Sequence, residues 1–116
     1  MEVWFNPSCS KSRASRDRLD AAGIGYTLRR YLDDPPTAAE LRTALAALRL
    51  EPWDVVRTAD PLARELRVRE LPRDPDVWIE LLVEHPQLIQ RPIVLAGDGR
   101  AWVARDDETL REITGA

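Results

Sequence analysis

The chain has 116 residues, 44% of them hydrophobic and 32% charged, which is enough to bury one core and is typical of an ordinary globular protein. Its formal net charge of -3 gives no overall electrostatic reason to expect nucleic acid or an anionic membrane as a partner. A single cysteine, Cys9, excludes an internal disulfide, and with one histidine no metal site is expected. The chain shows neither a secretory leader nor a membrane-spanning apolar run, so a cytoplasmic location is expected.

The first third of the chain predicts a β-α-β unit. Residues 2–5 form a short apolar run rich in β-forming residues, and an Asn-Pro pair ends it. Residues 11–22 predict a helix that ends at Gly23, and residues 24–31 predict a second strand. Because a strand-helix-strand crossover is almost always right-handed, we expect the two strands to form a parallel pair.

The middle of the chain is helical in pattern. Thr37 and Glu40 form a capping box before apolar residues at helical spacing, and residues 52–56 predict a short helical turn. An Asp-Pro pair at residues 60–61 predicts a helix through Leu66. A further helix over 76–84, closed by His85 and Pro86, is expected to bury Trp78, Leu81 and Leu82 on one face.

The last part of the chain predicts a β-hairpin and a final helix. Residues 92–95 and 101–104 read as strands around a Gly-Asp-Gly turn, and acidic residues at 106–108 begin a helix through Ile113. The whole order predicts one α/β domain over 1–116, a mixed β-sheet flanked by helices, with a helical insertion between the β-α-β and β-β-α halves.

Cys9 stands where the first predicted strand gives way to a helix. The free N–H groups and the positive end of the helix dipole favour a thiolate there, so the pKa of the thiol should fall. Lys11 and Arg13 add positive charge nearby, while Ser10 and Ser12 offer hydroxyl donors to the sulfur. A thiolate is the form that attacks disulfides and electrophilic oxyanions, so this setting favours a reactive cysteine over a merely buried one.

The spacing around Cys9 argues against two neighbouring chemistries. Ser12 occupies the position at which a Cys-x-x-Cys motif would place its second thiol, so a dithiol cycle within the motif is impossible. The phosphate loop of the tyrosine phosphatases places an arginine six residues after the cysteine, where this chain has Ser15. A single-thiol reaction that uses an outside thiol is therefore favoured.

The segment Asn-Pro-Ser-Cys-Ser-Lys-Ser-Arg at residues 6–13 resembles the Asn-Pro-x-Cys-x-x-Ser-Arg signature of the glutaredoxin-coupled arsenate reductase (ArsC-like) family of the thioredoxin superfamily. The likeness continues, in one order, through residues 31–36, 55–57, 85–94 and 102–105. It departs at Phe5, a position that is commonly polar, often histidine, in well-studied members. This resemblance implies a thioredoxin-like fold with a helical insertion.

The resemblance also implies roles for individual residues. Cys9 would attack arsenate to form a covalent thiol-arsenate adduct, and Arg57, Arg91 and Arg105 match the family's three oxyanion-binding arginines. Pro92 would follow a cis peptide bond that faces the cysteine. No cofactor would be bound. A low-molecular-weight thiol, glutathione or mycothiol, would act as co-substrate, and a glutaredoxin-like protein would supply electrons to a monomeric enzyme.

Two other functions stay open on the sequence. The same thiol chemistry could reduce mixed disulfides between proteins and a small thiol, with the arginines holding a carboxylate of that thiol. Alternatively, the chain could be an interaction protein like the Spx-type regulators, which share the fold and bind RNA polymerase. Those regulators typically carry a Cys-x-x-Cys switch, which Ser12 removes here.

Overall fold

The structure is a computed structural model that describes residues 1–115, so Ala116, the end of the predicted domain, lies outside the described residues. The chain divides into two compact units. The sheet unit comprises Met1–Asp34 together with the chain from Arg91 onward, and the helical unit comprises Pro35–Gln90. Within residues 1–115, none of the helices combines the length and the apolar character that crossing a membrane would require.

The sheet unit is built around a mixed four-stranded sheet in the order β2-β1-β3-β4. Strand β1 pairs with β2 in parallel and with β3 antiparallel, and β3 pairs with β4 antiparallel. This confirms the predicted parallel pair and the predicted hairpin. The elements of the unit are β1 (Glu2–Trp4), α1 (Ser10–Ala21), β2 (Thr27–Arg29), β3 (Ile93–Leu95), β4 (Ala101–Val103) and α5 (Asp107–Thr114).

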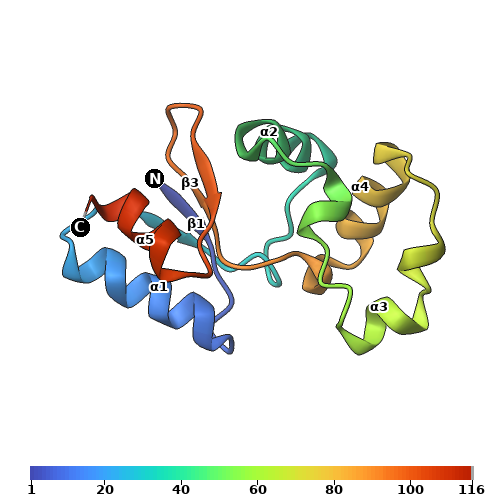
Figure 1. Ribbon diagram of the computed structural model, residues 1–116, viewed down its shortest axis with the longest axis horizontal. Coiled ribbons are helices and arrows are strands. Elements are labelled where there is room, and N and C mark those ends of the chain that lie inside the picture. Colours follow the sequence, from blue (N-terminus) through green and yellow to red (C-terminus); the bar gives the residue numbers. More distant parts are fainter. Residues whose placement is uncertain (116) are drawn as a thin grey trace. The chain divides into compact units, whose positions relative to one another are not determined.

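Helices α1 and α5 lie side by side over one face of this sheet (Figure 1). Side chains alternate between the two faces of a strand, so Val3 and Phe5 point toward these helices together. There they form a buried cluster with Leu19 of α1 and Leu110 of α5. The mixed sheet covered by helices is the α/β, thioredoxin-like architecture that the sequence predicted.

Strand β2 is shorter than predicted, because it covers Thr27–Arg29 and not residues 24–31. It lies at the edge of the sheet and has one neighbour, β1, which itself has only three residues. Few ladder hydrogen bonds are therefore available to extend it. Its Leu28 is 39% exposed, so the alternating pattern of this segment does not mark two buried faces.

The helical unit contains the predicted helices in their predicted order, with two further short helices, at residues 68–70 and 86–88, that were not predicted. Thr37 and Glu40 form the predicted capping box, in which the amide of Glu40 donates to Thr37 Oγ1 at 3.1 Å and the amide of Thr37 donates to Glu40 Oε1 at 3.0 Å. Asp60 accepts the predicted N-cap hydrogen bond from the amide of Leu62. The elements are α2 (Ala38–Leu48), η1 (Pro52–Val55), α3 (Pro61–Glu65), η2 (Val68–Glu70), α4 (Pro75–Glu84) and η3 (Pro86–Leu88).

The buried face of α4 differs from the prediction at one position. Trp78 and Leu82 are buried as expected, but Ile79 is buried in place of Leu81, which is half-buried. Helix α4 contacts α2, η1 and η3. A helix with neighbours on more than one side buries a wide face. The buried face of α4 is therefore rotated slightly relative to the predicted one.

Candidate functional site

Cys9 is the N-cap residue of α1, directly after the turn that leaves β1. The amide of Cys9 donates to the carbonyl of Asn6 at 3.0 Å, and the side-chain oxygen of Asn6 accepts from the amide of Ser8 at 2.9 Å. These bonds fix the loop between strand and helix. The neutral thiol makes no capping hydrogen bond, so the first amides of α1 remain available to a thiolate at this position.

The surroundings of Cys9 favour its ionised form. Burial raises the pKa of the Cys9 thiol, but the hydrogen bond from Arg91 and the backbone N–H groups of Ser12 and Lys11 outweigh burial, and the pKa falls to about 7. Cys9 is half-buried, so its sulfur remains within reach of a substrate. The lowered pKa therefore makes the thiolate accessible near neutral pH.

Two neighbours act on Cys9 differently from the sequence prediction. Ser12 was expected to offer its hydroxyl, but its buried Oγ accepts from the amide of Asn6 at 3.4 Å, and its backbone N–H serves the sulfur. Lys11 likewise acts on Cys9 through its backbone N–H. The pKa of the Asp106 carboxyl is lowered mainly by the backbone amide of Thr109, and the ammonium charge of Lys11 lowers it further.

Arg91 is the cation that the structure brings to Cys9. Burial lowers the pKa of the Arg91 guanidinium, but its interactions with Cys9 and Tyr31 more than offset this, so the pKa is raised. The peptide bond between Arg91 and Pro92 is cis, as the family resemblance implied. Arg91 is half-buried, and a guanidinium beside a thiolate is a donor array that suits an incoming oxyanion.

Arg105 lies beside Arg91. Its Nη1 donates to the backbone carbonyl of Arg91 at 2.7 Å. The preceding residue, Ala104, is buried and is held from two sides, by its amide to the carbonyl of Pro92 at 2.9 Å and by Ser15 Oγ, which donates to its carbonyl at 2.6 Å. Helix α1 thus carries both Cys9 and the serine that anchors the segment leading to Arg105.

Arg57 belongs to the helical unit, where a short pairing places its backbone. Val56 forms an antiparallel bridge with Ile89, and the amide of Arg57 donates to the carbonyl of Leu88 at 2.7 Å. The Arg57 Nη1 donates to Asp60 Oδ2 at 3.2 Å, so its charge is partly compensated within this unit. The sheet unit therefore contains three of the four predicted site residues, Cys9, Arg91 and Arg105.

Comparison with known proteins identifies the family. The sequence pattern of the ArsC family matches residues 4–113. The chain belongs to the ArsC family. The match extends over nearly the whole chain, as the predicted resemblance suggested.

Three relatives illustrate the range of this ArsC family similarity. An "Uncharacterized protein in glnII region" of Streptomyces viridochromogenes is 53% identical over 97% of each chain. An "Arsenate reductase" of Neisseria meningitidis serogroup A is 36% identical, again over 97% of each. The solved structure of an "Arsenate reductase" from Vibrio cholerae superposes with a TM-score of 0.89 at 34% identity and covers 97% of this chain and 98% of its own.

Phe5 is where this ArsC family chain departs from the expected polar residue. Its ring is buried, and the Arg16 guanidinium lies over it with the central carbon 5.4 Å from the ring centroid. Phe5 therefore contributes packing and a cation–π contact and supplies no titratable group beside Cys9. The lowered pKa of Cys9 depends on Arg91 and on backbone amides.

Tyr31 and Ser15 are site residues that the sequence reasoning missed. Tyr31 is fully buried and interacts with Arg91, and Ser15 holds the carbonyl of Ala104. The sequence held one sign of the role of Ser15: it lies four residues, about one helical turn, before the buried Leu19, so both share the buried face of α1. Among residues 1–115, no group of three or more His, Cys, Asp or Glu side chains is arranged to hold a metal ion.

Proposed function

We propose that this protein reduces arsenate to arsenite through a covalent adduct on Cys9. The observation that supports this most is the interaction of Arg91 with Cys9 at the N-terminus of α1, which makes a thiolate available at neutral pH. The family membership and the relatives named as arsenate reductases add support from the whole length of the chain.

The proposed chemistry begins when the Cys9 thiolate attacks As(V) and forms an S–As bond, while an arsenate hydroxyl takes up a proton from solvent and leaves as water. Because the attack brings one negative charge toward another, cations at the oxyanion lower the barrier. Arg91 and Arg105 are proposed to bind the arsenate oxygens, and the family resemblance adds Arg57 as a third ligand. Their planar guanidinium groups can each donate two parallel hydrogen bonds.

The electrons come from outside the chain, since Cys9 is its single cysteine. Reduction of As(V) to As(III) takes two electrons, and two thiols that become one disulfide supply them. We propose that glutathione or mycothiol resolves the adduct, and that a glutaredoxin-like protein then reduces the resulting disulfide. Such a cycle needs a reducing compartment such as the cytoplasm.

The test is arsenite production from arsenate by the purified protein. One arm supplies glutathione with glutaredoxin, and the other supplies mycothiol with its own reductase. We expect turnover in one arm that is abolished in Cys9→Ser, and about a 100-fold lower kcat/KM in Arg91→Gln and in Arg105→Gln. Arg100→Gln is the matched control, because Arg100 pairs with Asp98 in the hairpin turn at 2.8 Å.

Failure in both arms, from a protein whose Cys9 alkylates readily at neutral pH, would overturn the arsenate proposal. A mixed disulfide between a protein and glutathione is then the second substrate to supply. If the arginine substitutions reduce arsenate turnover while mixed-disulfide reduction stays intact, arsenate is the substrate for which these residues are arranged. The reverse pattern would favour the disulfide.

A further inference from the structure

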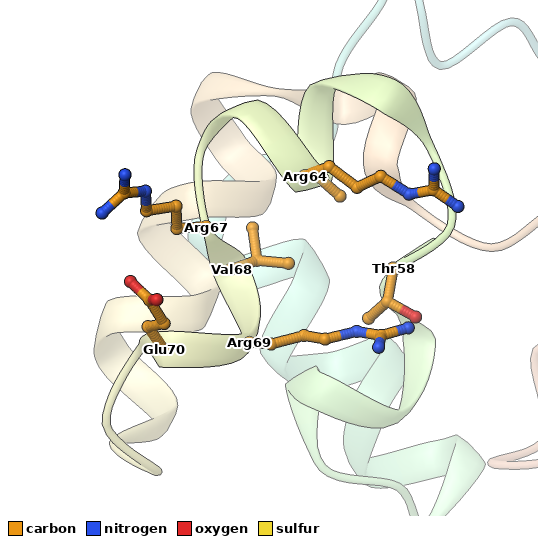
Figure 2. Close-up of a pocket in the computed structure, with 7 residues that line it drawn as sticks. Thr58, Arg64, Arg67, Val68, Arg69 and Glu70 are labelled. Carbon is orange, nitrogen blue, oxygen red and sulfur yellow. The ribbon is translucent and has the colours of Figure 1, made fainter.

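A second basic feature lies in the helical unit, around the turn that joins α3 to η2. A hollow of about 440 Å³ opens there (Figure 2). Two buried side chains, Ala63 and Val68, form part of its lining, together with Arg64, Arg69 and Thr58. A volume of this size falls in the range of small-ligand sites. The hollow contains none of the residues proposed for the arsenate reaction.

The lining side chains divide into two groups in Figure 2. Arg64 and Arg69 both extend toward the side of the hollow where Thr58 lies. Arg67 and Glu70 extend to the opposite side. The carboxylate of Glu70 is therefore directed away from the Arg64 and Arg69 pair, and the neighbouring hydroxyl of Thr58 adds a neutral donor on their side.

The backbone explains why two arginines from different helices share one side. Arg67 adopts the left-handed conformation, with φ 53°, which is uncommon for a residue other than glycine. The amide of Arg67 donates to the carbonyl of Arg64 at 3.1 Å, and the amide of Glu70 donates to the carbonyl of Arg67 at 3.0 Å. This reversal ends α3 and starts η2, so Arg64 and Arg69 flank the same hollow.

The side chains of Arg64 and Arg69 are exposed to solvent. In the part of the chain that the structure describes, their guanidinium groups make no hydrogen bond and no ion pair. Other arginines of the same unit do, such as Arg42 with Asp76 at 2.9 Å and Arg57 with Asp60 at 3.2 Å. Two guanidinium groups directed to one side can both donate to an anion bound there, because solvent and salt reduce the repulsion between them.

We propose that this hollow is a second anion site, which binds a phosphate group. The donors approach from several directions, with two guanidinium groups and a hydroxyl, which suits the several oxygens of a tetrahedral oxyanion better than a planar carboxylate. The phosphate could be free or carried by a small molecule, since the same oxygens are recognised in both cases. This site does not depend on the chemistry proposed for Cys9.

The test is a titration of the full chain with inorganic phosphate, followed by backbone amide NMR. A parallel titration with sodium chloride at matched ionic strength removes the effect of screening. We expect saturable shifts at Thr58, Arg64 and Arg69 with phosphate alone. Arg64→Gln and Arg69→Gln should each weaken this binding about tenfold or more, the size expected for losing one charge-assisted hydrogen bond.

Arg67→Gln is the matched control, since it removes the same charge from a side chain that extends away from the hollow. It should leave the saturable phosphate shifts at Arg64 and Arg69 unchanged. A comparison of glycerol 3-phosphate with inorganic phosphate, with glycerol as the control that lacks phosphate, then separates a carried phosphate from a free one. Tighter binding of glycerol 3-phosphate indicates a carried phosphate, tighter binding of inorganic phosphate indicates a free one, and both results support the site. Linear shifts that sodium chloride reproduces, or an equal loss in Arg67→Gln, would overturn the proposal.

Discussion

At the scale of single residues, the contact of Arg91 with Cys9 is the largest of the contributions that lower the pKa of the Cys9 thiol. Removing the cation favours the neutral thiol, so in Arg91→Gln the pKa of Cys9 should rise from about 7 toward the ordinary thiol range. If it reaches ~8.5, the alkylation rate at pH 7 falls about 15-fold, because the thiolate is the reactive form. The rate of iodoacetamide alkylation is measured at intervals of about one pH unit from pH 5 to pH 10, and the midpoint of its pH dependence gives the pKa of Cys9. The control Arg100→Gln should leave the midpoint unchanged. If Arg91→Gln also leaves it unchanged, Arg91 does not lower the pKa of Cys9.

Tyr31 acts at the same scale, through Arg91. Tyr31→Phe keeps the buried ring and removes the hydroxyl that interacts with the guanidinium. We expect a change of at most about 1 kcal/mol in the free energy of unfolding, since the buried ring stays and only one hydroxyl is removed. As a positioning residue, Tyr31 should also affect the site, so the KM for arsenate should rise severalfold and the Cys9 midpoint should move less than in Arg91→Gln.

The control for Tyr31 is Tyr26→Phe. The Tyr26 hydroxyl donates to Asp20 on the surface of the sheet unit, and losing this bond should change neither the KM nor the midpoint. Urea denaturation and the alkylation profile measure the two effects separately. If Tyr31→Phe lowers stability and leaves both site readouts unchanged, the role of Tyr31 is structural alone.

At the scale of elements, Ser15 connects α1 to the segment that precedes Arg105. Ser15→Ala leaves the buried carbonyl of Ala104 without the donor that lies 2.6 Å away, and this should cost about 1–3 kcal/mol of unfolding free energy. Thr43→Ala is the comparison, because Thr43 Oγ1 donates to the carbonyl of Ala39 on an exposed face of α2, where the change should stay within about 0.5 kcal/mol. Equal losses in urea denaturation would contradict the importance of the buried bond.

At the scale of the whole molecule, the sheet unit is assembled from both ends of the chain. Strand β1 pairs with β3, which follows the entire helical unit in sequence. Closing so long a loop has an entropic cost, and this cost is smaller when residues 35–90 are already folded. We therefore predict one cooperative thermal transition, with equal calorimetric and van't Hoff enthalpies, as expected for the single domain that the sequence predicts.

A core substitution in the helical unit tests this cooperativity. Leu82 is fully buried in α4, and Leu82→Ala should cost about 2–5 kcal/mol. In a single cooperative domain the whole transition moves to lower temperature. Two separate transitions by calorimetry, with Leu82→Ala shifting one of them, would show instead that the units unfold independently.

The sequence by itself determined the features that depend on neighbours along the chain. The capping box of Thr37 and Glu40 joins residues three positions apart, and the hairpin turn uses Gly97 and Gly99 with positive φ. Cys9 could be placed at a helix start for the same reason, since the turn and the helix signals lie within a few residues. The short helices η2 and η3 were not predicted, because three residues are too few to show a period.

The tertiary structure alone decided which distant residues meet. The partnership of Arg91 with Cys9 and Tyr31 and the bond from Ser15 to Ala104 join segments that the pairing of β1 with β3 or the packing of α1 brings together. Nothing local in the sequence encodes these distances, because they depend on sheet register and on helix packing. The same is true of the length of β2 and the buried face of α4, which the number and position of neighbouring elements set.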